Sequence, residues 1–305
     1  MQNPKVFNQT AHGSDGWDAA AAAPNHPNGG GTCDAVDAPL SPASIAPGGI
    51  PGMGGEAAAL RLEKRTHLDE GNYRIVLVNY GAGLGEIGWS FISSKKPIKA
   101  GRGNSDNREE NEDRSVRRAR SRLRRLILSS GADHLLTLTY RGNITDFDQA
   151  CSDLNKFVRI VKGKLPGWIY IAVAEQQKRG AWHWHMAVCG RQDVELLRTT
   201  WRHVVGEGNI DVRPPKGTGK QRLLGLVKYL GKYLAKGFQE GNRELNARRF
   251  RASLGIRIPY TSIPLPPDQR GNASGYAVQM LKANVGEVGY VWLAEDRPAG
   301  WACSW

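Results

Sequence analysis

The stretch that decides the fold is WIYIAVAEQQKRGAWHWHMAV, at residues 168–188. It contains two mainly apolar runs, Trp168 to Glu175 and Ala181 to Val188, on either side of a short polar segment. That segment, Gln176 to Gly180, has the length and composition of a turn. Two such runs joined by a short turn predict a pair of antiparallel strands, so a β-hairpin is expected here.

The returning strand carries two histidines, His183 and His185. Because side chains alternate across a strand, both imidazoles would project from one face, and Glu175 would lie across the hairpin on that face. Two imidazoles and one carboxylate leave coordination positions open, where a hard ion such as Mg²⁺ or Mn²⁺ can hold a phosphate oxygen. The alternatives are buried histidines with hydrogen-bond partners and, for Glu175, a surface ion pair with Lys178 or Arg179.

A second pattern, QRLLGLVKYLGKYLAK at residues 221–236, predicts a helix. Tyr229 and Tyr233 lie four residues apart, with Lys232 and Lys236 three beyond each, so all four would project from one side. A tyrosine can attack a phosphate when a metal and lysines supply positioning and charge neutralisation; the alternative is that the tyrosines pack the helix. The opposite, apolar stripe consists of Leu223, Leu226, Val227, Leu230 and Leu234.

The formal net charge of +13 favours a polyanionic partner, with nucleic acid as the leading candidate. Part of this charge lies in RSVRRARSRLRRLILSS at residues 114–130, which has the spacing of an amphipathic helix and no acidic residue. These arginines would repel one another unless anions neutralise them, so we expect phosphate contact; the alternative is a solvated face. The predicted DNA-binding residues are Arg114, Arg117, Arg118, Arg120, Arg122, Arg124 and Arg125.

Other segments have simpler patterns. The sequence HLLTLTY at residues 134–140 predicts a buried strand, and residues 145–161 have helical spacing. Shorter strand candidates are residues 73–79 and 289–294. The polar stretch at residues 95–113 is expected to form a loop.

Several features limit the function classes. The first 60 residues are rich in Ala, Gly, Pro and Asn and are expected to form a disordered leader. No run approaches the roughly 18 apolar residues of a membrane helix, so neither export nor membrane insertion is expected. The four cysteines are widely separated, as is typical of the reducing cytoplasm. The segment KGTGK at residues 216–220 lacks the spacing of a phosphate-binding loop, so no nucleotide cofactor is expected.

Together, these patterns resemble the HUH endonucleases, specifically the two-tyrosine rolling-circle replication initiators of small plasmids and single-stranded-DNA phages. Three motifs match in order: LLTLTY at 135–140, GAWHWHMAV at 180–188 and YLGKYLAK at 229–236. The similarity covers roughly residues 114–237. The metal motif departs from the family pattern, because Trp184 takes the place of an aliphatic residue between the histidines.

The resemblance implies an α+β fold with a central antiparallel sheet of about five strands, of the ferredoxin/RRM-like type. It places helices on one face and the metal site on the other, with the tyrosine helix over the metal. The expected organisation is a leader at 1–60, a nicking endonuclease domain at 61–260 and a C-terminal extension of unknown role at 261–305. The protein would act in the cytoplasm of a bacterial host.

The implied reaction is cleavage of single-stranded or extruded origin DNA by one tyrosine, which leaves a 5′-phosphotyrosyl link and a free 3′-hydroxyl. A host helicase and polymerase would be partners. A related transposase or conjugative relaxase is the alternative within the superfamily. A non-catalytic protein that grips single-stranded nucleic acid, with Trp182 and Trp184 as a stacking platform, is the alternative from another class.

Overall fold

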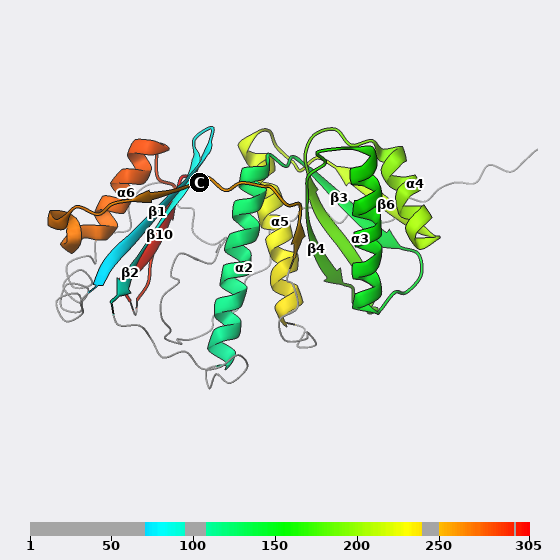
Figure 1. Cartoon of the computed structure of the whole chain (residues 1–305), viewed down its shortest axis with the longest axis horizontal. Helices are drawn as coiled ribbons and strands as arrows, with labels where there is room; N and C mark the ends of the chain where they lie inside the picture. The colour runs from blue at the N-terminus through cyan, green and yellow to red at the C-terminus, as the bar shows by residue number, and fades with distance from the viewer. Residues whose placement is uncertain (1–70, 95–107, 240–249, 296) are drawn as a thin grey trace, which may run out of the picture.

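The computed structural model describes residues 71–94, 108–239, 250–295 and 297–305, so the leader expected at 1–60 lies outside the described residues. Two five-stranded antiparallel sheets lie on either side of helices α2 and α5 (Figure 1). The predicted α+β class and the five-stranded antiparallel sheet are confirmed. The second sheet was not predicted.

We call the sheet that carries His183 and His185 the histidine sheet. The hairpin predicted from the opening motif is confirmed, because its two strands pair antiparallel with Glu175 opposite His183. The strand expected at residues 134–140 pairs with the other side of the second hairpin strand. In the order β6-β3-β5-β4-β7, the strands are β6 (Gly208–Arg213), β3 (His134–Tyr140), β5 (Trp182–Val188), β4 (Tyr170–Gln176) and β7 (Arg251–Ala252).

One face of the histidine sheet packs against helices α3 (Phe147–Lys164) and α4 (Val194–Val205). Each helix begins after an aspartate, Asp146 or Asp193, whose carboxylate accepts hydrogen bonds from backbone N–H groups of the first turn. Trp184 is buried in this layer. The apolar side chains that alternate with the two histidines therefore form a core, as the strand periodicity predicted.

The other face packs against helices α2 (Arg108–Ser130) and α5 (Lys220–Gln239). The helices thus cover both faces of the sheet, and α5 covers the histidine face, where the tyrosine helix was expected. The loop predicted at residues 95–113 is wrong for its last part, since α2 already begins at Arg108. The apolar stripe of α5 is confirmed as core through its buried members Leu226, Val227, Leu230 and Leu234.

The second sheet, which we call the outer sheet, packs against helix α6 (Ala273–Asn284), which follows the short helix η1 (Pro267–Asn272). The predicted division of the chain near residue 260 stays a prediction, although strands from both sides of it pair in this sheet. In the order β8-β1-β2-β10-β9, the strands are β8 (Tyr260–Ile263), β1 (Gly71–Gly81), β2 (Leu84–Ser93), β10 (Ala299–Cys303) and β9 (Tyr290–Leu293).

A buried ion-pair cluster joins α2 to the outer sheet. Glu86 of β2 is 1% exposed and accepts hydrogen bonds from the Nε atoms of Arg124 and Arg125. Burial alone would raise the pKa of Glu86, but the two guanidinium groups outweigh it and hold the pKa below its usual range. The structure therefore corrects the predicted phosphate contact of Arg124 and Arg125, because both bind a carboxylate inside the fold.

Within the described segments, no helix combines the length and the apolar character needed to cross a lipid bilayer.

Candidate active site on the histidine sheet

Strand register brings the three predicted metal ligands onto one face of the histidine sheet. Glu175 lies directly opposite His183, and His185 follows two residues later on the same strand. On the other side of β5, Thr137 lies opposite His185. This face is the one that α5 covers, so the motif residues of the hairpin and of the helix meet there.

Helix α5 places both tyrosines against His185. The Tyr233 ring stacks on the His185 imidazole, with centroids 4.1 Å apart and an interplanar angle of 16°. The Tyr229 ring meets the same imidazole edge-on at 5.5 Å. The two phenol oxygens are 3.3 Å apart and share a hydrogen bond, so both hydroxyl groups belong to one cluster.

The Glu175 carboxylate links the hairpin to α5. Its Oε2 atom is 2.8 Å from His185 Nε2, and its Oε1 atom accepts a hydrogen bond of 3.0 Å from Lys236 Nζ. Burial would raise the pKa of Glu175, but the hydrogen bonds from His185 and Lys236 keep it below its usual range. The surface pair of Glu175 with Lys178 or Arg179 is not what forms; the carboxylate stays ionised inside the cluster.

His183 is the least satisfied member of the cluster. Its ring is buried, and its Nε2 atom has no hydrogen-bond partner among the residues that the structure describes. Burial and the neighbouring His185 ring lower the pKa of His183 to about 4. The ring is therefore neutral at neutral pH, and a neutral imidazole is the form that can donate a lone pair to a metal ion.

The donor set is compatible with a divalent ion, but the three predicted ligands are not already arranged around one position. Across the described ranges, no group of three or more His, Cys, Asp or Glu side chains has the geometry to hold a metal. The reason is visible in the contacts, since Glu175 is bonded to His185 and Lys236. The unpartnered Nε2 atom of His183 is the observation that fits an ion at this site.

Two side chains that the sequence argument did not select orient the imidazoles. The Thr137 hydroxyl oxygen lies 3.3 Å from His185 Nδ1, and the Gln177 amide nitrogen lies 3.4 Å from His183 Nδ1. Partners on Nδ1 fix the ring orientation and leave Nε2 to face the cluster. Thr137 belongs to the LLTLTY motif, so strand alternation opposite a histidine was the available signal.

Comparisons with known proteins support a replication-associated function. Residues 133–238 match a family of replication-associated proteins, the ORF2 type. The chain is also 26% identical over 134 residues to the Phasyl DNA replicon protein arp of Escherichia coli, which covers 37% of this chain and 47% of the relative. The chain thus spans about half the length of this curated relative. The search of solved structures gave no match.

The family match contains the whole candidate cluster. It begins just before β3, includes the β4–β5 hairpin and ends near the last residue of α5. The matched segment is therefore the part of the chain that folds into the histidine sheet and its tyrosine helix.

Other predicted residues lie apart from this cluster. Lys232 is exposed, with its Nζ atom 5.8 Å from the Tyr233 ring centroid, whereas Lys236 is the lysine of α5 that bonds to Glu175. The remaining predicted DNA-binding residues lie along α2, which packs beside α5. Their phosphate contact stays a prediction for Arg114, Arg117, Arg118, Arg120 and Arg122.

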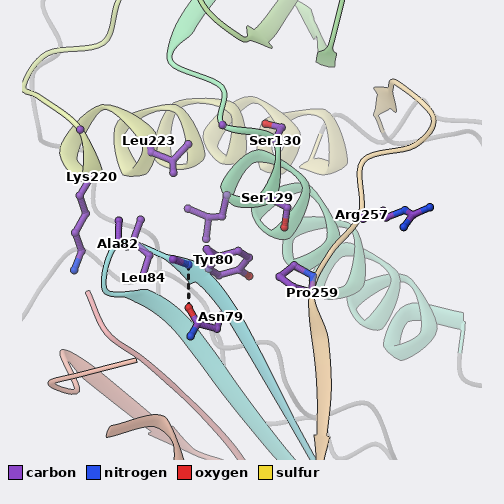
Figure 2. Close-up of a pocket in the computed structure, with 14 residues that line it drawn as sticks. Asn79, Tyr80, Ala82, Leu84, Ser129, Ser130, Lys220, Leu223, Arg257 and Pro259 are labelled. Atoms are coloured by element: carbon purple, nitrogen blue, oxygen red, sulfur yellow. Dashed lines mark hydrogen bonds between the residues drawn. The ribbon is translucent and has the colours of Figure 1, made fainter. Parts of the chain in front are cut away.

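A cavity of about 580 Å³ lies at the start of α5, on the side of the outer sheet (Figure 2). Its lining includes Tyr80 and Leu223 but none of the predicted catalytic or metal-binding residues. Lys220 lines it too, and its Nζ atom donates hydrogen bonds to the carbonyl oxygens of Gly83 and Ser304. This cation therefore ties α5 to the outer sheet, and we place the active site at the histidine cluster on chemical grounds.

Proposed function

We propose that this protein is a replication initiator that nicks single-stranded origin DNA by tyrosine attack. The similarity to a replicon protein and to replication-associated proteins supports the first part of this proposal. The observation that carries the second part is the contact of both tyrosines with His185, because it places two nucleophiles beside a candidate metal ligand.

The reaction follows from the chemistry of a phenol. A tyrosine oxygen attacks the phosphorus atom, the bond from phosphorus to the 3′-oxygen breaks, and the phenol proton passes in net terms to that 3′-oxygen. The products are a 5′-phosphotyrosyl link and a 3′-hydroxyl that a polymerase can extend. Because the phosphodiester energy is kept in the tyrosyl ester, a later hydroxyl can reseal the strand.

The second tyrosine gives the site a second nucleophile 3.3 Å from the first. One round of circle synthesis needs a strand transfer at its start and another at its end. Two tyrosines that reach the same position can perform these transfers in turn. This arrangement favours the replication initiator over the related transposase or relaxase.

His183, His185 and Glu175 would hold a Mg²⁺ or Mn²⁺ ion, which supplies Lewis-acid polarisation of a phosphate oxygen. The chain itself supplies the rest of the environment. Lys236 neutralises Glu175, while hydrogen-bond partners on the Nδ1 atoms keep both imidazole rings oriented. Burial raises the pKa of the Tyr229 phenol above its ordinary value, so this tyrosine keeps its proton until it attacks.

The test is covalent attachment to single-stranded DNA. The wild-type chain, incubated with Mn²⁺ and a pool of random-sequence oligonucleotides, should form a protein–DNA adduct that survives denaturation. Replacing Tyr229 and Tyr233 together with Phe should abolish it, while Tyr290→Phe, an exposed tyrosine on β9, should not. An adduct that persists in the double variant contradicts the proposal, and intact DNA with wild-type protein favours a non-catalytic binding protein.

The partners follow from the reaction. The product is a primed strand on a duplex, so a helicase and a polymerase from the bacterial host would be needed to extend it. The cytoplasm is the compartment in which they act.

A further inference from the structure

The two tyrosines have different surroundings, although their hydroxyl groups are bonded to each other. Tyr233 lies flat against the His185 ring, with the Lys232 ammonium group on its own ring. Tyr229 meets His185 only edge-on, and its charged neighbours include Asp211 and Arg213. The site is therefore asymmetric, with Tyr229 on the side of β6.

Strand register places these two β6 residues on the face of the histidine sheet that holds the cluster. Asp211 lies opposite Thr137, which in turn lies opposite His185, so the three side chains form a row across β6, β3 and β5. Arg213 follows two residues after Asp211 and projects from the same face. Neither residue belongs to a motif that the sequence argument used.

β6 is the outermost strand on its side of the sheet as far as the described residues go. Arg213 is 53% exposed and Asp211 45% exposed. A strand of DNA that approached the tyrosines from this edge would meet Arg213 before it met the buried histidines.

The Arg213 guanidinium group is already oriented but remains exchangeable. Its Nε and a terminal N–H both donate to one carboxylate oxygen of Asp211. This contact fixes the direction of the guanidinium plane, while the exposure of both groups makes the pair weak. A phosphate with two free oxygens matches the two-pronged donor geometry of arginine better than a single carboxylate oxygen does.

We propose that Arg213 binds the scissile phosphate beside Tyr229, and that Tyr229 is therefore the tyrosine that makes the first cleavage. This inference rests on the proposed nicking function. In that step the Tyr229 oxygen forms a bond to phosphorus, the bond to the 3′-oxygen breaks, and the 3′-oxygen gains the phenol proton. Arg213 donates hydrogen bonds to the non-bridging oxygens, where negative charge grows during attack.

The experiment measures the first turnover of the full chain with Mn²⁺ and the random-sequence oligonucleotide pool. Mass spectrometry of the adduct identifies the modified tyrosine, and the rate of adduct formation is compared among variants. Arg213→Gln should slow the rate by about a hundredfold, the usual effect of removing one donor to a developing charge. Arg213→Lys should recover part of the rate, because it restores the charge but not the paired donors.

Arg141→Gln is the matched control, since Arg141 is also an exposed arginine paired with a carboxylate, that of Glu207 next to β6. Its rate should equal the wild-type rate. Thermal unfolding of each variant shows that the fold is kept. A first-turnover adduct on Tyr233, or an Arg213→Gln rate equal to the control, overturns this inference and leaves the nicking function intact. Absence of any wild-type adduct overturns both.

Discussion

Two glutamates, Glu86 and Glu175, lie on opposite sides of the α2–α5 layer, and each is held by two basic side chains. Glu86 is sealed between two arginines, and all three groups are largely buried. Glu175 is bonded to His185 and Lys236 at a more exposed position, beside two phenol groups. Arginine cannot give up its proton in a protein, whereas histidine and lysine can be displaced or can exchange partners. The first cluster is built to stay closed, and the second can open for a ligand.

Removing the charge of Glu86 is the strongest way to test this difference. Glu86→Gln should destabilise the fold by about 3–5 kcal/mol, because it leaves two guanidinium groups without a charged partner in the interior. Urea unfolding measures the change. Glu207→Gln, which affects an exposed pair with Arg141, should cost at most about 1 kcal/mol. Equal losses for the two variants would show that the Glu86 cluster is not a structural anchor.

Glu175→Gln should have the opposite profile. The free energy of unfolding should change little, while the rate of Mn²⁺-dependent adduct formation should fall by about ten- to a hundredfold, the range seen when groups around a metal are changed. Adduct yield over time is the measurement. A variant that unfolds easily and yet nicks at the wild-type rate would reverse the roles assigned to the two glutamates.

The pH dependence of stability gives a smaller effect of the Glu86 cluster. Since the folded protein holds the pKa of Glu86 below its unfolded value, unfolding takes up a proton in acid. The stabilisation is complete above the unfolded pKa of about 4.3 and is lost as the pH falls through the folded pKa, with a slope of at most about 1.4 kcal/mol per pH unit. Urea titrations at several acidic pH values measure this slope. Glu86→Gln should reduce it, and an unchanged slope would assign acid sensitivity to other groups.

The sequence was sufficient where the signal was local. The β4–β5 hairpin and the α5 stripe follow from alternation and helical spacing within about 20 residues, so the meeting of His185 with Tyr233 could be expected once the two elements were known to pack. The spacing of Tyr229 and Tyr233 also predicted that their hydroxyl groups would be neighbours.

The sequence was insufficient where partners are distant. Arg124 and Arg125 belong to a row that has the pattern of a solvated face, and only the approach of Glu86, 38 residues away from Arg124, shows that they are interior. The outer sheet depends on short strands such as β8 and β9, which pair with segments far away in the chain and have little periodicity of their own. Arg213 lacked a motif, so its place beside Tyr229 emerges only from strand register.

The lone nitrogen of His183 has a consequence for heat resistance. A buried polar atom without a bonding partner is a standing penalty that the native state alone carries, because water satisfies the same atom once the chain melts. A species that binds this nitrogen in the native state shifts the balance between the two states by mass action. The chain should then melt at a higher temperature when that species is present, even when no DNA is there to be cut.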